Sequence, residues 1–160
     1  MVGRMRQEDI WDAEVARDYD RSDGGMFAAE VVEPTVDCLA GLAGSGRALE
    51  FAIGTGRVAV PLAARGVPVT GIELSQPMIS QLREKADEAA IPVINGDMAT
   101  SRAPGEYSLV YLVYNTIGNL LTQAEQVECF RNAARHLSPP PAQVRTGAPP
   151  GGRIPAGEDR

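Results

Sequence analysis

The chain has 160 residues, which is enough for one domain with a substantial buried core. Hydrophobic residues make up 44% of it and charged residues 22%, as in ordinary globular proteins. The formal net charge of −6 argues against a nucleic-acid partner, because neutralising phosphates requires a basic face. No apolar run approaches the ~20 residues of a membrane span, so we expect a cytoplasmic protein without membrane contact.

The two cysteines, Cys38 and Cys129, are too few for a disulfide framework and have no partners at metal-ligand spacing. Free cysteine is among the most buried residue types, so we expect both thiols to be reduced and buried. The sequence therefore predicts neither a disulfide nor a metal site.

Residues 1–44 are predicted to form an N-terminal helical region. A polar helix or helical arm is expected over residues 5–21, with Trp11 among its apolar anchors. A second helix is expected over about 26–43, in which Pro34 is a point where the helix can kink.

Strand and helix patterns alternate from residue 45 to residue 139. The expected strands are 47–53, 67–72, 91–95 and 107–114, and the expected helices are about 56–65, 76–90 and 122–137. Ser75 is the expected N-cap of the helix at 76–90. This alternation is typical of a parallel sheet built from right-handed crossovers. The last strand is continuously apolar, as expected of a strand that is covered on both faces.

The end of the chain has a different composition. Ten of the 23 residues from Ser138 to Arg160 are Pro or Gly, and no helix or strand period continues there. We expect an irregular tail at 140–160, of the kind that a shifted reading frame or a truncated gene produces. If the sheet ends at 107–114, that strand is an exposed apolar edge, and we expect self-association through it.

The stretch RALEFAIGTGR, residues 47–57, is the most informative one in the chain. An apolar run containing Glu50 leads into Gly54 and Gly56 and then directly into helical sequence. Glycine tolerates a positive φ and lets backbone N–H groups approach a ligand closely. A second acid, Glu73, closes the apolar run VPVTGIEL 17 residues after Gly56. The two features together predict a nucleotide-like cofactor.

Four stretches of the sequence occur in an order and spacing similar to those of class I S-adenosylmethionine-dependent methyltransferases. They are ALEFAIGTGR, VTGIELSQPMI, NGDMAT and YSLVYLVYNTIGNL, and the resemblance covers residues 45–139. It implies an α/β, Rossmann-like parallel sheet of strand order 3-2-1-4 with flanking helices, an incomplete form of the family fold that stops after the fourth strand. It also implies S-adenosyl-L-methionine as cofactor and methyl transfer to a small-molecule acceptor.

The resemblance implies roles for individual residues. The loop after the first strand would hold the methionine end of the cofactor, Glu73 the ribose hydroxyls, and Asp97 the adenine amino group. Met98 would pack on the adenine ring. The expected cofactor-binding residues are Tyr19, Glu50, Ala52, Gly54, Thr55, Gly56, Glu73, Leu74, Met78, Asp97, Met98 and Asn115.

Several of these positions depart from the family pattern or have a second interpretation. Ala52 stands where relatives carry their first loop glycine. Tyr19 and Asp20 resemble a Tyr-Asp pair that relatives carry near the entrance of the cofactor or substrate site. The alternative is that they belong to a mobile terminal arm without that role. Asn115 either faces the transferred methyl group or forms a turn, and Glu73 could also cap the following helix.

No residue is assigned to catalysis, because in-line attack on an activated sulfonium methyl requires positioning rather than an obligatory acid–base pair. The only histidine, His136, is expected near a helix end, where a cation interacts favourably with the helix dipole. We do not expect it to act in catalysis.

Two other functions stay open. Residues 54–59, GTGRVA, fit the G-x-G-x-x-A form of a dinucleotide fingerprint, which would indicate an NAD(P)-binding oxidoreductase domain. Alternatively, the chain is a truncated and inactive pseudoenzyme that has kept part of the family fold.

Overall fold

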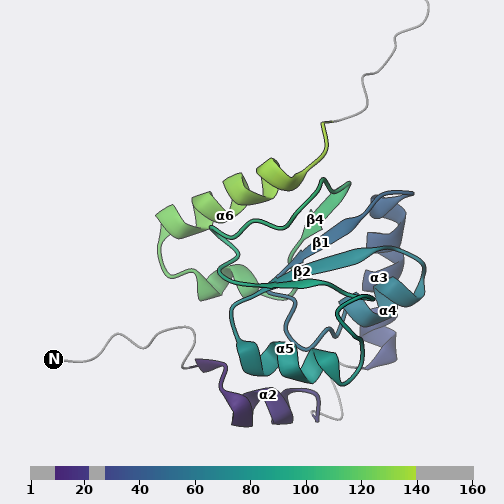
Figure 1. Ribbon diagram of the computed structural model, residues 1–160, viewed down its shortest axis with the longest axis vertical. Helices are drawn as coiled ribbons and strands as arrows, with labels where there is room; N and C mark the ends of the chain where they lie inside the picture. The colour runs from purple at the N-terminus through teal and green to yellow at the C-terminus, as the bar shows by residue number, and fades with distance from the viewer. Residues whose placement is uncertain (1–9, 22–27, 140–160) are drawn as a thin grey trace, which may run out of the picture.

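The computed structural model describes residues 10–21 and 28–139, and its centre is a four-stranded parallel sheet. The strands are β1 (Ala48–Phe51), β2 (Val69–Glu73), β3 (Val93–Asn95) and β4 (Leu109–Tyr111). They lie in the order β3-β2-β1-β4, and every neighbouring pair is parallel (Figure 1). The strand order predicted from the sequence is therefore confirmed.

Helices cover both faces of the sheet. The helical elements are α2 (Ala13–Tyr19), α3 (Ala29–Ala43), α4 (Ala59–Ala64), α5 (Gln76–Arg83), the 3-10 helix η2 (Thr116–Asn119) and α6 (Gln123–His136). Helices α3 and α4 lie on one side of the sheet and α6 on the other, while α2 lies outside α5 (Figure 1). No helix of the described residues is both long and apolar enough to cross a membrane.

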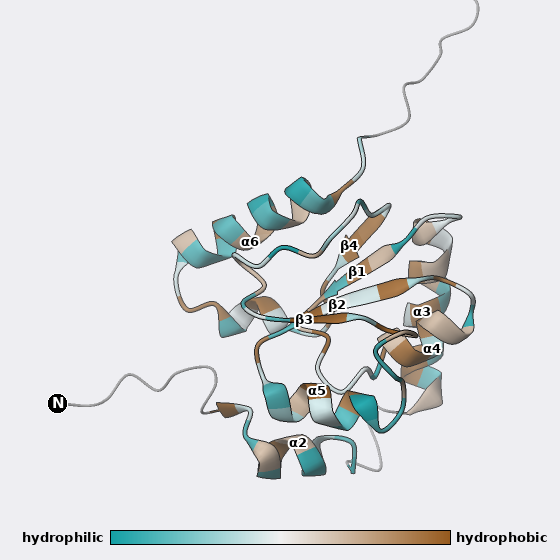
Figure 2. Ribbon diagram, in the orientation of Figure 1, coloured by the Kyte–Doolittle hydropathy of each residue, from teal (hydrophilic) through white to brown (hydrophobic). Residues whose placement is uncertain are grey.

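The core has two layers, one on each face of the sheet. Alternate residues of β1 enter opposite layers: Ala48 packs among residues of α3 and α4, whereas Leu49 and Phe51 pack with residues that include Cys129 of α6. Hydrophobic residues concentrate in the strands, and the flanking helices carry most of the hydrophilic ones (Figure 2). Strand β4 is covered on both faces, as its continuous apolar sequence predicts, because Leu109 and Tyr111 pack in one layer and Val110 in the other.

Most of the strands and helices are shorter than their sequence patterns predict, and α5 and β4 are two examples. Helix α5 ends at Arg83 instead of near residue 90, because the Arg83 guanidinium donates to the carbonyl oxygens of Ala86, Asp87 and Ile91 and holds that segment in turns. Strand β4 ends at Tyr111, and Tyr114 then adopts a left-handed φ of 54° before η2.

Within the predicted arm of residues 5–21, the chain is not helical at residues 11 and 12, and α2 starts after Asp12. The Asp12 carboxylate accepts from the backbone N–H groups of Glu14 and Val15 at 2.9 and 3.0 Å, which makes Asp12 the N-cap. The part of the predicted arm before residue 10 lies outside the described residues, as does the tail at 140–160.

Two sequence-based expectations about single residues are wrong. Cys38 is exposed on α3, because the helical period turns it away from the sheet; only Cys129 is buried. His136 is not a cation at a helix end. Its Nε2 accepts a hydrogen bond from the Ala103 N–H at 3.0 Å, and burial lowers its pKa, so the ring is neutral and ties α6 to the loop before β4.

The chain just before β4 makes backbone hydrogen bonds on the outer side of the sheet. Tyr107 donates its N–H to the His136 carbonyl at 2.9 Å and accepts from the Ser138 N–H at 2.8 Å, which forms an isolated parallel bridge between Tyr107 and Leu137. Pro139 follows and has no N–H to continue the ladder. Among the described residues, β4 itself pairs only with β1.

Gly71 in β2 gives a direct test of the packing between β2 and the loop after β1. A Cβ at Gly71 would lie 2.5 Å from Ile53 Cδ1 and 2.8 Å from Ile53 Cβ. We expect Gly71→Ala to lower the free energy of unfolding by about 1–3 kcal/mol, because the rigid Ile53 side chain must shift.

Gly41 in α3 is the matched control, since a Cβ there would meet no atom within 4 Å. Gly41→Ala should raise the free energy of unfolding by about 0.5–1 kcal/mol through helix propensity. Urea unfolding of both variants measures the difference. Equal stability of Gly71→Ala and the wild type would contradict this packing.

Candidate functional site

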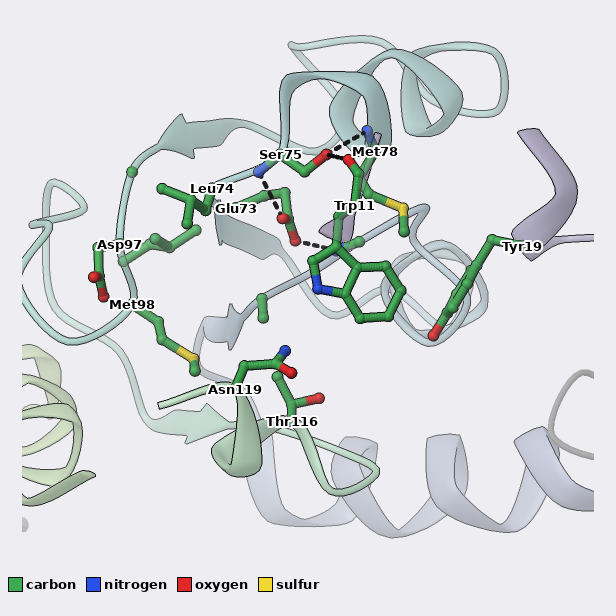
Figure 3. Close-up of a pocket in the computed structure, with 14 residues that line it drawn as sticks. Trp11, Tyr19, Glu73, Leu74, Ser75, Met78, Asp97, Met98, Thr116 and Asn119 are labelled. Carbon is green, nitrogen blue, oxygen red and sulfur yellow. Dashed lines mark hydrogen bonds between the residues drawn. The ribbon is translucent and has the colours of Figure 1, made fainter. Parts of the chain in front are cut away.

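A pocket lies beyond the carboxyl ends of the central strands, where the chain leaves β1, β2 and β3 (Figure 3). Its empty space is about 670 Å³, counting the part that opens to solvent, which suits a small-molecule ligand. The lining residues are Trp11, Tyr19, Ala52, Gly54, Ile72, Glu73, Leu74, Ser75, Met78, Gly96, Asp97, Met98, Thr116 and Asn119.

The loop after β1 has an unusual backbone that brings its amides to the pocket. Three of its residues have a positive φ: Ala52 at 52°, Gly54 at 59° and Gly56 at 80°. Ala52 adopts the left-handed conformation although it has a side chain, which costs roughly 1–2 kcal/mol. Gly56 is also required by packing, because a Cβ there would lie 2.3 Å from Leu82 Cδ1 of α5.

Glu73 ends β2 and connects this glycine loop to the start of α5. Its Oε2 accepts from the Gly54 N–H and its Oε1 from the Ser75 N–H, both at 2.8 Å. The carboxyl is 7% exposed; burial raises its pKa, and the backbone hydrogen bonds oppose that rise. Since a carboxylate offers about four acceptor positions, Glu73 can also accept hydrogen bonds from ligand hydroxyls.

The far end of the pocket combines a carboxylate with apolar side chains. Asp97 follows β3 and uses its Oδ1 to accept from the Ala99 N–H at 2.7 Å. The thioether of Met98 extends toward η2, where Thr116 and Asn119 lie (Figure 3). An acceptor beside a flat apolar surface is what an adenine ring with its amino group requires.

A smaller hollow adjoins the pocket on the side of the glycine loop. It shares Tyr19, Ala52, Gly54 and Thr116 with the pocket and is also lined by Glu50, Ile53, Thr55, Arg57, Val58, Val113 and Tyr114. The Arg57 guanidinium lies over the Tyr114 ring, 3.6 Å from its centroid. This hollow therefore presents a cation and loop amides next to the larger pocket.

Glu50 lies beneath this hollow in the sheet. It is 3% exposed, and its Oε2 accepts from the Tyr111 hydroxyl at 2.9 Å. Burial raises the pKa of Glu50 to about 8, so its side chain is largely protonated at neutral pH.

The structure brings most of the predicted site residues together. Eight of them line the pocket, namely Tyr19, Ala52, Gly54, Glu73, Leu74, Met78, Asp97 and Met98. Glu50 and Thr55 line the smaller hollow, whereas Gly56 and Asn115 line neither. Asn115 precedes η2 without a side-chain capping bond, in agreement with the turn interpretation of that residue. Cofactor binding by these residues stays a prediction.

Six lining residues were not predicted for the site: Trp11, Ile72, Ser75, Gly96, Thr116 and Asn119. Trp11 was expected only as an apolar anchor, and Ser75 only as a helix cap. Ser75 does cap α5 through Met78 N at 3.3 Å, but its hydroxyl also donates to the Trp11 carbonyl at 2.6 Å. For these residues, the sequence offered one signal of a role in the pocket: Trp11 is the only tryptophan and lies in an otherwise polar segment.

Comparison with known families agrees with this geometry. Residues 48–140 match the family described as methyltransferase domain, which is more than half of the chain. The chain belongs to this family.

Relatives in sequence and structure carry the same description. YqeM of Bacillus subtilis (strain 168), a proposed methyltransferase, is 32% identical over 102 residues, which are 62% of this chain and 41% of YqeM. The CcbJ methyltransferase from Streptomyces caelestis is 36% identical, with a TM-score of 0.71 over 78% of this chain and 52% of CcbJ.

The glycopeptide N-methyltransferase MtfA, solved with S-adenosyl-L-methionine, is 26% identical, with a TM-score of 0.59 over 66% of this chain and 49% of MtfA. The chain spans about half the length of these relatives.

The buried Glu50 carboxyl predicts a pH dependence of stability. Its pKa of about 8 in the folded chain lies above the ordinary glutamate pKa of 4.5, so the folded chain binds more protons than the unfolded chain between these values. The free energy of unfolding should therefore fall as the pH rises through this window.

Glu50→Gln removes the titrating group but keeps an oxygen that accepts from the Tyr111 hydroxyl. We expect its stability to fall less steeply between about pH 5 and about pH 8 than that of the wild type. Urea unfolding at several pH values measures both slopes, and all other titrating groups cancel in the comparison. Identical slopes would show that Glu50 titrates normally in the folded chain.

Proposed function

We propose that this domain binds S-adenosyl-L-methionine in the pocket beyond β1, β2 and β3 and transfers its methyl group to a small-molecule acceptor. The observation that carries the proposal is the placement of Glu73. Its carboxylate lies at the end of β2, between the glycine loop and the Asp97 end of the pocket. Binding of S-adenosyl-L-methionine by MtfA, which shares the fold, supports it.

The residues present fit the cofactor along its whole length. Two ribose hydroxyls are donors, and Glu73 has acceptor positions left for them. The adenine amino group is a donor that suits Asp97, while Leu74, Met78 and Met98 supply apolar surface for the ring. The methionine end would extend toward the smaller hollow, where the positive charge of Arg57 suits its carboxylate.

The reaction itself requires little acid–base chemistry from the protein. The bound cofactor supplies a methyl group on a sulfonium, and an acceptor nitrogen that attacks it releases S-adenosylhomocysteine and loses its own proton to solvent. None of the residues that line the two hollows is His or Lys. The protein therefore contributes by holding the two reactants in line and excluding water.

An amine on a small molecule is the acceptor class that we propose. MtfA is by name a glycopeptide N-methyltransferase, which supports nitrogen as the attacking atom. The smaller hollow, which Tyr19, Thr116 and Tyr114 also line, suits a polar, hydroxyl-bearing amine. We expect this activity in the cytoplasm, as the sequence indicates.

A second proposal concerns the edge of the sheet. Beyond the Tyr107–Leu137 bridge, β4 has no partner strand on its outer side among the described residues, and such an edge can pair with another chain. We expect concentration-dependent association in sedimentation velocity, with slower amide exchange at Val110 in the associated form. Leu109 already donates its N–H to the Arg47 carbonyl beside β1, and successive amides of a strand point to opposite sides. A single monomeric species at all concentrations would contradict this association.

Isothermal titration with S-adenosylhomocysteine, beside NADH, tests the main proposal. Saturable binding of S-adenosylhomocysteine alone is expected. Glu73→Gln should weaken that binding about tenfold to hundredfold, because charge-assisted hydrogen bonds to the ribose are lost. Glu30→Gln removes the same negative charge at an exposed position on α3, and this variant should bind like the wild type.

The two alternative functions give different results in this titration. Saturable binding of NADH alone would support an oxidoreductase domain and overturn the proposal. A folded chain that binds neither ligand would support the pseudoenzyme alternative. Binding that is unchanged in Glu73→Gln would place the ligand elsewhere on the molecule.

A further inference from the structure

Helix α2 forms an outer wall of the pocket through two aromatic rings. Trp11, just before α2, and Tyr19, its last residue, both line the pocket. Their rings meet edge to face, with centroids 5.7 Å apart and an interplanar angle of 82°. The helix itself packs against α5, outside the sheet (Figures 1 and 3).

Helix α2 has little stability of its own. Helix α2 has 7 residues, of which only Ala16 is buried, and helices of that length are marginal in water. No residue of α2 belongs to either hydrophobic core cluster of the domain. Polar contacts must therefore contribute much of what holds α2 over the pocket.

The strongest of these contacts converge on Asp20, which directly follows α2. Its Oδ1 accepts from the Thr55 hydroxyl at 2.6 Å, and its Oδ2 pairs with the Lys85 ammonium. Lys85 donates in addition to the Thr55 carbonyl at 2.8 Å. Three segments that are distant in sequence thus meet at one charged cluster: the end of α2, the glycine loop and the turn after α5.

The cluster is partly shielded from water. The side chains of Lys85 and Asp20 are 33% and 26% exposed, whereas the Arg21–Asp18 pair in the same segment is 79% and 63% exposed. A shielded pair that shares a neutral hydrogen-bonding partner is screened less than an exposed pair. At the other end of α2, the Ser75 hydroxyl fixes the Trp11 carbonyl at 2.6 Å.

We propose that Asp20, Lys85 and Thr55 form a clasp that keeps α2 closed over the bound cofactor, which makes Asp20 and Lys85 positioning residues for cofactor retention. The inference rests on the proposed function, because it takes the pocket to be the cofactor site. The clasp joins α2 to the glycine loop, and both line the ligand space. Closure of α2 and cofactor binding therefore favour each other reciprocally.

Lys85→Met tests the clasp, because it keeps the length of the side chain and removes its charge. Trp11 is the only tryptophan of the chain, so its fluorescence reports directly on whether α2 covers the pocket. We expect acrylamide to quench Trp11 more strongly in ligand-free Lys85→Met than in the wild type. The Kd for S-adenosylhomocysteine should rise about fivefold to tenfold, while the melting temperature changes little because α2 lies outside both cores.

Two further variants separate positioning from a general effect of charge. Arg21→Ala removes a cation from the same segment but only breaks the exposed pair with Asp18, so quenching and Kd should stay at wild-type values. Lys85→Arg restores the charge and should recover most of the affinity. High salt should weaken ligand binding by the wild type more than by Lys85→Met.

Wild-type quenching and wild-type Kd in Lys85→Met would overturn the clasp while leaving the cofactor site intact. A fall in melting temperature that accounts for the whole loss of affinity would also overturn it, since Lys85 would then serve the fold. If the wild type itself fails to bind S-adenosylhomocysteine, the proposed function fails. The quenching comparison in the ligand-free protein then still decides whether the three residues hold α2.

Discussion

The candidate site depends on one buried carboxylate that joins two strand ends. Glu73 at the end of β2 accepts hydrogen bonds from Gly54 in the loop after β1 and from Ser75 at the start of α5. This connection fixes the glycine loop relative to α5, and the pocket opens between them. A parallel sheet places its strand ends at one edge, so a single side chain can set the shape of the whole site.

Two buried glutamates on neighbouring strands both have raised pKa values, but they differ in their hydrogen-bonding partners. Glu50 in β1 receives one phenolic hydrogen bond, from Tyr111, and burial raises its pKa to about 8. Glu73 receives backbone hydrogen bonds that oppose the effect of burial, and it faces the pocket. Glu50, which is largely protonated, thus lies in the sheet beside Tyr111. Glu73, which accepts from backbone amides, lies where a ligand can use its remaining acceptor positions.

The parts of the fold that depend on residues close together in the sequence could be predicted from the sequence. The glycine loop and the Ser75 cap follow from local patterns, the strand order was implied by the resemblance to a known family, and the structure shows all three. The contacts that bridge distant segments could not, such as Lys85 with Asp20, 65 residues apart. His136 is a similar case, because burial lowers its pKa and its Nε2 accepts a hydrogen bond from the Ala103 N–H, 33 residues away.

The backbone amide of Gly54 offers the most direct measurement of the central claim, because it donates to Glu73 beside the ligand space. Nitrogen–proton NMR spectra recorded during a titration with S-adenosylhomocysteine would follow it. The account predicts saturable shifts of the Gly54 and Ser75 amides, together with the indole signal of Trp11, at one common Kd. Saturable binding that leaves the Gly54 and Ser75 signals in place would contradict it.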